Sequence, residues 1–184
     1  MATKKFGIVL DAKKCLNCKA CTVACKFENT IHPGEDDYRI WVTELELKGT
    51  YPNISQEYQP SQCQHCENTP CASVCPTKAT YKSPEGVVLI DYDKCILCKA
   101  CMTACPYDAR YENVHLHAID KCTFCYQRQP EGREPACVET CPTRVRVFGD
   151  LNDPESEASK LLARNHTYQL KPERNTRPRL HYIK

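Results

Sequence analysis

The apolar residues of this chain come in short runs between polar and cysteine-rich stretches. The runs FGIVLD, VVLID and VRVFGD each have the length of one strand, and the turn SPEG joins VVLID to a predicted strand at Thr80–Lys82. The segment YRIWVTELELKG alternates so that Trp41, Thr43, Leu45 and Leu47 share one face of a further strand. The pattern therefore predicts several short strands, and we expect Trp41 to pack in the core.

Two kinds of segment predict helices. ACTVAC and ACMTAC each place small residues between cysteines four positions apart, a separation of about one helical turn. Nearer the C-terminus, Asp153 is a suitable N-cap for a helix from Pro154 to about Arg164. The remaining sequence, HTYQLKPERNTRPRLHYIK, predicts an extended coil with a basic charge.

Composition leaves little material for an ordinary hydrophobic core. Of the 184 residues 41% are apolar, but that fraction includes 16 cysteines, and only 4 phenylalanines and 1 tryptophan accompany 13 prolines. The net charge of +2 gives no indication of a nucleic-acid or membrane-surface partner. No apolar run reaches the roughly 18 residues of a membrane helix. The N-terminal sequence MATKKFGIVLDAKKC predicts no export signal of the chain's own.

All the cysteines fall into blocks of four with related spacing. Blocks one and three read CxxCxxCxxxC, block two has two extra residues in its middle gap, and block four has eleven residues there. In chain order the blocks are Cys15, Cys18, Cys21 and Cys25; Cys63, Cys66, Cys71 and Cys75; Cys95, Cys98, Cys101 and Cys105; Cys122, Cys125, Cys137 and Cys141. Such repetition indicates four copies of one ligand motif.

Three kinds of chemistry could use these thiols. Disulfides would strain a CxxCxxC loop and do not suit an unexported chain, and a four-thiolate zinc site takes two CxxC pairs from distant segments. A cubane iron–sulfur cluster takes one thiolate per iron, and CxxCxxCxxxCP is the ligand run of bacterial two-cluster ferredoxins, whose fourth cysteine ligates the other cluster. Pro76, Pro106 and Pro142 complete this run in three blocks, whereas Lys26 follows block one. The 16 thiolates therefore predict four 4Fe–4S clusters.

The linkers predict which blocks pair. Residues 75–95 join blocks two and three as a strand, turn and strand, as in a bacterial ferredoxin, which leaves blocks one and four to form a second unit. The predicted ligand sets are Cys15, Cys18, Cys21 and Cys141 for cluster A; Cys25, Cys122, Cys125 and Cys137 for cluster B; Cys63, Cys66, Cys71 and Cys105 for cluster C; Cys75, Cys95, Cys98 and Cys101 for cluster D. Sequential pairing, one with two and three with four, is the alternative. The long gap between blocks one and two disfavours it, but the short gap between blocks three and four does not.

The chain is accordingly predicted to be an α+β protein built from two ferredoxin-like units. Residues 1–30 with 110–150 would form an outer unit, 58–109 an inner unit, 31–57 a strand insertion, and 151–184 a short helix with an extended basic tail. We expect the insertion to cover a cluster or to pack the units together; contact with a partner is the alternative.

Four ferredoxin-type blocks in one short chain also characterise a known family. The stretches that carry the likeness are CQHCENTPCASVCPTKATY, CKACMTACPYDARY, DKCTFCYQRQPEGREPACVETCPT and FGDLNDPES. On these motifs the chain resembles the iron–sulfur (B) subunits of respiratory molybdopterin oxidoreductases, the dimethyl sulfoxide reductase superfamily. Within that family it is most similar to the B subunits of polysulfide and thiosulfate reductases.

The resemblance implies a non-catalytic electron-transfer subunit. It would relay electrons between an integral membrane quinol or quinone anchor and a catalytic subunit with a molybdenum–bis-pterin guanine dinucleotide centre. It also implies a peripheral place in a membrane-bound complex, at the periplasmic face by co-export with the catalytic subunit, or alternatively in the cytoplasm. Other interpretations are a subunit of a formate dehydrogenase or hydrogenase, a free polyferredoxin, and a zinc-stabilised binding module.

Beside the cysteines, the sequence contains no catalytic constellation: there is no GxGxxG or phosphate-binding loop, and the 6 histidines form no convincing metal set. A cation near a cluster favours its reduced, more negative state, and a donor to sulfur does the same. The candidates for such tuning are His65, Lys13, Lys14, Lys19, Lys94, Lys99 and Lys121. Most of these lysines are expected on a solvated face. Because the apolar core is thin, we also predict that the chain needs its clusters to fold.

Overall fold

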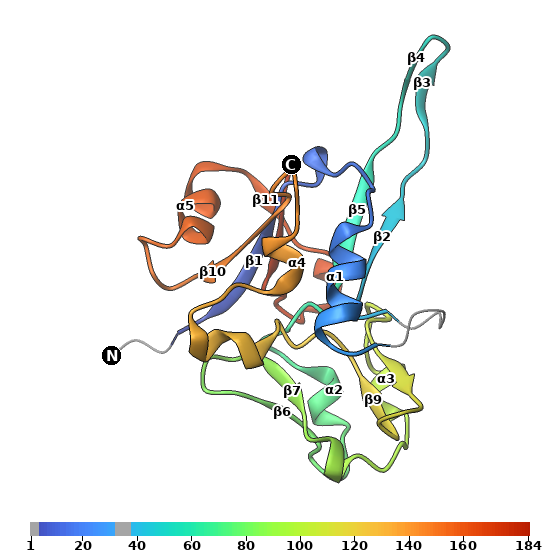
Figure 1. Cartoon of the computed structure of the whole chain (residues 1–184), viewed down its shortest axis with the longest axis vertical. Coiled ribbons are helices and arrows are strands. Elements are labelled where there is room, and N and C mark those ends of the chain that lie inside the picture. The colour runs from blue at the N-terminus through green and yellow to red at the C-terminus, as the bar shows by residue number, and fades with distance from the viewer. Residues whose placement is uncertain (1–3, 32–37) are drawn as a thin grey trace.

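The computed structural model describes residues 4–31 and 38–184. Positions 1–3 and 32–37, which belong to the predicted outer unit and strand insertion, lie outside the described residues. The structure combines short helices with small sheets, which confirms the α+β class (Figure 1). Among the described residues no helix has the length and apolarity needed to cross a bilayer.

The elements are short. The helices are α1 (Ala20–Glu28), α2 (Pro70–Ser73), α3 (Ala100–Thr103), α4 (Ala136–Glu139) and α5 (Glu157–Arg164). The strands are β1 (Phe6–Leu10), β2 (Ile40–Glu44), β3 (Lys48–Thr50), β4 (Asn53–Ser55), β5 (Tyr58–Gln62), β6 (Thr80–Lys82), β7 (Val88–Ile90), β8 (Tyr111–Asn113), β9 (Ala118–Asp120), β10 (Arg146–Asp150), β11 (Thr167–Tyr168) and β12 (Leu180–Ile183). Single 3₁₀ turns or short 3₁₀ segments lie at Ala12–Lys14, Tyr92–Lys94, Tyr126–Glu131 and Pro172–Arg174.

Each cysteine block lies between two strands. β1 and β2 flank block one, β5 and β6 block two, β7 and β8 block three, and β9 and β10 block four. The antiparallel pairs β2·β5, β6·β7 and β8·β9 connect successive blocks, and β1·β10 closes the series by joining block one to block four. Blocks at opposite ends of the cysteine region are thereby brought side by side.

The residue after the last cysteine decides how long each block's helix is. Proline lacks a backbone N–H and disfavours a helical residue before it. Pro76, Pro106 and Pro142 occupy this position in three blocks, whose helices α2, α3 and α4 have only 4 residues. Lys26 occupies it in block one, and α1 continues past it to 9 residues. The helices predicted in ACTVAC and ACMTAC are confirmed.

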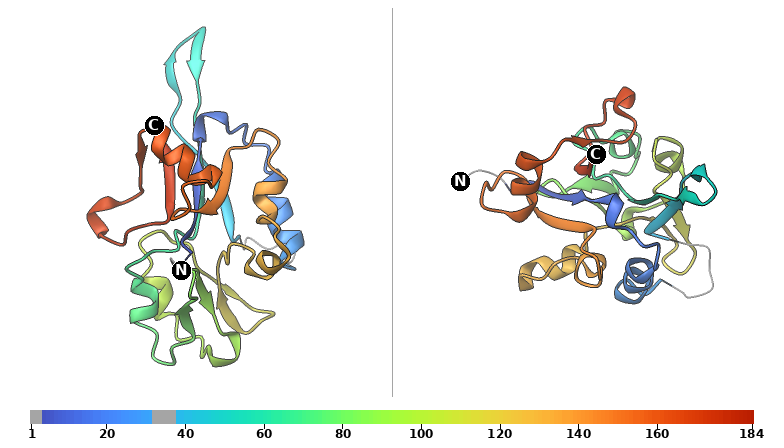
Figure 2. Two further views of the ribbon diagram at one scale, coloured as in Figure 1. Left: turned by 90° about the vertical axis from the view of Figure 1, so that its left-hand side faces the viewer. Right: turned by 90° about the horizontal axis from the view of Figure 1, so that it is seen from above.

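The predicted strands are found, and Trp41 packs against the core as expected, although the buried residues of β2 lie on the opposite face. β6 matches the prediction Thr80–Lys82, β7 lies within the predicted apolar run, and β1 and β10 lie within theirs. In β2, however, Ile40 and Val42 are buried, while Thr43 is exposed and Trp41 is half-buried against the main core. Ile40 is buried on that face because it packs beside Cys25 and Cys137. Beyond β2 the chain extends into the β3–β4 hairpin, which projects from the body (Figures 1 and 2).

The C-terminal segment departs most from prediction. Ser156 rather than Asp153 caps α5, since the Ser156 hydroxyl accepts from Ser159 N–H at 3.1 Å. The predicted coil contains β12, which lies parallel to β1 in the four-stranded sheet of order β10-β1-β12-β11. Leu180 and Tyr182 on β12 are fully buried. The expectation of an extended coil throughout is therefore wrong, because alternate residues of β12 complete the core under β1.

Candidate metal centres

The cysteine side chains gather into four quartets. Each contains three cysteines of one block and the fourth cysteine of its partner block, and all sixteen are free thiols. Quartet A is Cys15, Cys18, Cys21 and Cys141; quartet B is Cys25, Cys122, Cys125 and Cys137; quartet C is Cys63, Cys66, Cys71 and Cys105; quartet D is Cys75, Cys95, Cys98 and Cys101. The structure thus brings together the cysteines that were predicted to share a cluster.

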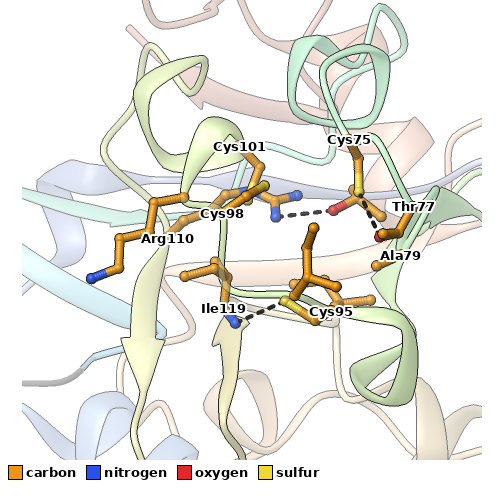
Figure 3. Close-up of a pocket in the computed structure, with 12 residues that line it drawn as sticks. Cys75, Thr77, Ala79, Cys95, Cys98, Cys101, Arg110 and Ile119 are labelled. Atoms are coloured by element: carbon orange, nitrogen blue, oxygen red, sulfur yellow. Dashed lines mark hydrogen bonds between the residues drawn. The ribbon is translucent and has the colours of Figure 1, made fainter.

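Quartet D surrounds a cavity between β7, α3 and the start of β6 (Figure 3). The backbone N–H of Ile119 donates to Cys95 Sγ at 3.5 Å, and Cys75 Sγ lies 3.7 Å from the Thr77 hydroxyl. Arg110 lines the same cavity. Amide and hydroxyl donors aimed at sulfur stabilise a thiolate, which is the state that binds iron.

Quartet A repeats this arrangement between blocks one and four. Its cavity is lined by the four thiols together with Arg146. Cys141 Sγ accepts from Val145 N–H at 3.3 Å and lies 3.9 Å from the Thr143 hydroxyl, as Cys75 lies beside Thr77 in quartet D. The two quartets therefore use equivalent donors at equivalent positions after the fourth cysteine of a block.

Quartets B and C lie in the interior. All four thiols of B are buried, and Cys63, Cys66 and Cys71 of C are buried as well. In B, the Asn29 amide lies 3.6 Å from Cys25 Sγ, and Phe124 N–H donates to Cys122 Sγ at 3.4 Å. These two quartets are adjacent, because Gln62, the residue before Cys63, donates its side-chain amide to Cys122 Sγ at 3.7 Å.

Burial disfavours the thiolate form of Cys66 in quartet C and of Cys137 in quartet B. It raises the pKa of Cys66 to about 12, and the neighbouring thiols of quartet C add to the effect. Burial likewise raises the pKa of Cys137 to about 12, although the Arg146 guanidinium acts in the opposite direction. Since iron binds the thiolate, loading a quartet must release protons.

The candidate lysines separate into exposed and buried ones. Lys14 and Lys94, which directly precede blocks one and three, are exposed and form ion pairs with Asp11 and Asp91. Lys13, Lys19 and Lys99 are likewise engaged at or near the surface, with Lys184 O, Val42 O and Glu112 respectively. Lys121, which precedes block four, is instead fully buried. Burial lowers the pKa of Lys121, while the thiols of Cys63 and Cys122 raise it.

His65 lies at the contact between quartets B and C. Its ring stacks on Phe124 with centroids 3.7 Å apart, and its Nδ1 accepts from Val88 N–H at 3.1 Å. Burial, followed by the charge of Lys121, holds the pKa of His65 well below its usual value, so the ring is neutral with its proton on Nε2. Nε2 is buried without a hydrogen-bond partner among the described residues. Donation to a cluster sulfur stays a prediction.

Sequence reasoning missed two buried arginines, Arg110 and Arg146. Each stands five residues after the last cysteine of its block, a repeated position that could have identified them. The Nη2 atom of each arginine is buried without a hydrogen-bond partner among the described residues. Each arginine also lines a cavity that contains four cysteines. A thiolate-ligated cluster is anionic and offers sulfur acceptors, so these residues fit such a group.

Known sequence families agree with this chemistry. Two sequence models of a 4Fe–4S dicluster domain match the chain, one at residues 54–151 and one at residues 14–79. Two such domains carry four 4Fe–4S clusters. Each model follows the sequence and so combines successive blocks, whereas the cavities combine block one with block four.

Relatives of known description cover nearly the whole chain. It is 42% identical over 181 residues to the B component of the polysulfide reductase of Wolinella succinogenes, covering 98% of this chain and 94% of the relative. It is 40% identical over 205 residues to the iron–sulfur B component of a putative dimethyl sulfoxide reductase of Halobacterium salinarum, covering 97% and 78%. It is also 40% identical over 201 residues to the B component of the sulfite dehydrogenase of Allochromatium vinosum, covering 97% and 82%. By these likenesses and the dicluster match, the chain belongs to the family of iron–sulfur B subunits, which transfer electrons for molybdopterin oxidoreductases and are not their catalytic subunits.

Proposed function

We propose that the four quartets each ligate one 4Fe–4S cluster and that electrons pass along them in the order A–B–C–D. The observation that carries this order is the exposure of the thiols. Quartets A and D each have one exposed cysteine, Cys18 and Cys98, whereas no cysteine of B or C is exposed. Electrons therefore enter and leave at A and D and cross the interior through B and C.

Contacts between quartets support the same order. Cys21 of A lies close enough to Cys137 of B to raise the pKa of Cys137, and Cys63 of C lies close enough to Cys122 of B to raise the pKa of Cys122. Quartets C and D are connected through block three. Helix α3 contains Cys101 of D, and Cys105 of C follows soon after the helix. Each cluster thus has its nearest neighbour one step along the path.

The partners proposed are those that the family resemblance implies. We propose that one end of the path docks on a catalytic subunit with a molybdenum–bis-pterin guanine dinucleotide centre, and the other on a membrane subunit that exchanges electrons with quinol or quinone. Similarity to a component of a polysulfide reductase supports a sulfur-compound reductase. The chain would then be a peripheral subunit at the periplasmic face, exported together with its catalytic partner.

Cluster content and ligand assignment have separate tests. The chain purified without oxygen should contain about sixteen iron and about sixteen sulfide ions. If the purified chain contained zinc and no iron, the proposal would be wrong. In the Cys105→Ser variant the EPR signal of the cluster at Cys63, Cys66 and Cys71 should change. In the matched Cys75→Ser variant the signal of the other inner cluster should change instead. The reverse outcome would show that the fourth cysteines do not cross over.

Partner assignment is tested with the native assembly. A molybdenum-containing subunit should co-purify with the chain from membranes, and a quinol analogue should reduce the clusters in the complex. A chain that purifies alone and accepts electrons from unrelated donors would instead be a free polyferredoxin.

A further inference from the structure

Three cations of the described chain are buried beside the quartets without a carboxylate partner. Arg110, Lys121 and Arg146 are exposed by only 6%, 0% and 2%. Their hydrogen-bond acceptors are neutral: Arg110 donates to the Thr80 hydroxyl at 3.2 Å, Lys121 to the Cys122 carbonyl at 2.8 Å and to Val88 O, and Arg146 to the Gln62 side-chain oxygen. The other buried arginines among the described residues face carboxylates: Arg39 faces Asp120, Arg128 faces Glu28 and Glu139, and Arg179 faces Glu67 and Asp150.

The three cations are distributed one to each gap between successive quartets. Arg146 lines the cavity of A and also lies beside the B thiols. Lys121 lies beside thiols of both B and C. Arg110 lines the cavity of D and also lies beside the C thiols. The neighbouring thiols are Cys21, Cys137 and Cys122 for Arg146; Cys122, Cys63 and Cys71 for Lys121; Cys101, Cys71 and Cys63 for Arg110.

The repeat explains how the chain places them. Arg110 and Arg146 follow the fourth cysteine of their blocks by five residues, where the backbone turns back from the neighbouring quartet into the next strand. Lys121 ends the connection from β9 to block four, and the equivalent Lys14 and Lys94 remain at the surface with aspartate partners. Lys121 differs because its ammonium group is buried and donates to Val88 O on β7 and to Cys122 O.

A positive charge in a gap acts on the clusters at both sides. A cluster with four thiolates is anionic and gains one more negative charge on reduction, so a fixed cation stabilises the reduced state. The interaction falls off with distance and is little screened when both charges are buried. We propose that Arg146, Lys121 and Arg110 each raise the reduction potentials of the two clusters that flank them, so that B and C, which each have two flanking cations, are affected more than A and D. This inference rests on the proposed order A–B–C–D.

The test uses the chain purified with its clusters. Variants Arg146→Gln, Lys121→Gln and Arg110→Gln are titrated with reductant while EPR records each cluster, the signals being assigned with the serine variants above. Each should shift two potentials to more negative values: A and B for Arg146, B and C for Lys121, C and D for Arg110. The matched control is Lys94→Gln, which removes an exposed lysine from the position equivalent to Lys121 and should leave all four potentials at their native values.

Several outcomes would overturn the inference. These are a shift confined to one cluster, a shift in a pair that does not flank the substituted residue, or an equal shift in Lys94→Gln. If a glutamine variant loses iron, the charge-retaining variants Arg110→Lys, Arg146→Lys and Lys121→Arg decide: native potentials support the inference, and shifted potentials or lost iron oppose it. Failure of the proposed function is recognised separately by the iron content: the native chain would then contain far fewer than the expected number of about sixteen iron ions.

Discussion

A buried ion pair between Arg39 and Asp120 connects the residue before β2 to the end of β9, the strand before block four. Arg39 donates from Nε and from Nη2 to the same Asp120 oxygen, each at 3.0 Å, and the two side chains are exposed by 7% and 0%. Asp120 also accepts from the Tyr92 and Tyr111 hydroxyls at 2.9 and 2.6 Å, and from Lys121 N–H at 2.7 Å. We predict that Arg39→Met destabilises the chain severely.

The magnitude follows from what the substitution leaves behind. Removing one partner of a buried ion pair typically costs about 3–5 kcal/mol, because the remaining charge is buried without compensation. Asp120 keeps three other donors, so we expect a value near the lower end, about 3 kcal/mol. That corresponds to roughly a 100-fold faster unfolding if the ion pair is already broken in the transition state.

The assay is the rate at which clusters are lost in urea, followed by their visible absorbance without oxygen, because unfolding with cluster loss is irreversible and is measured as a rate. Arg39→Met should lose its clusters much faster than native chain. The control Lys48→Met breaks the exposed pair of Lys48 with Glu57 and should cost less than about 1 kcal/mol. The double variant Arg39→Met with Asp120→Asn should be more stable than Arg39→Met alone. Equal rates for native chain and Arg39→Met, or no recovery in the double variant, would refute the reasoning.

Two further predictions concern the whole chain and its C-terminal helix. Removing iron with a chelator should abolish the native circular dichroism, because the apolar clusters of the core are built partly from ligand cysteines; an iron-free chain with a native-like spectrum would contradict this. Ser156→Ala should cost about 1 kcal/mol of stability by removing the cap of α5. The matched Asp153→Ala should cost less in the same urea assay, and equal losses would show that the cap is not specific to Ser156.

Local signals in the sequence predicted what local chemistry determines. The spacing of the cysteines, the turn before β7 and the small residues in α3 each act within a few positions, and the structure has the expected elements there. The gathering of the quartets was also predicted, because a helical turn separates the third cysteine of a block from the fourth and carries it toward the neighbouring quartet.

Features that depend on long-range packing were not predicted. The alternation of β2 allowed either face to be buried, and only the neighbouring thiols of Cys25 and Cys137 select the face of Ile40. The strand β12 is preceded by prolines and basic residues, and its pairing with β1 spans almost the entire chain. Arginine is usually found at the protein surface, so its residue type gave no reason to expect Arg110 in the interior. Only the three-dimensional structure shows it buried beside thiols.

If the two units are nested as we propose, the nesting constrains the order in which they can be completed. Every cysteine of quartets C and D lies between Cys63 and Cys105, so the inner unit is complete within one continuous segment. Quartets A and B need blocks from both sides of that segment, held together by β1·β10. Closing a short loop costs less entropy than closing a long one, and a folded inner unit shortens the effective distance between blocks one and four. The inner clusters are therefore expected to form first, and the interior contact between B and C then becomes the surface on which the outer unit assembles.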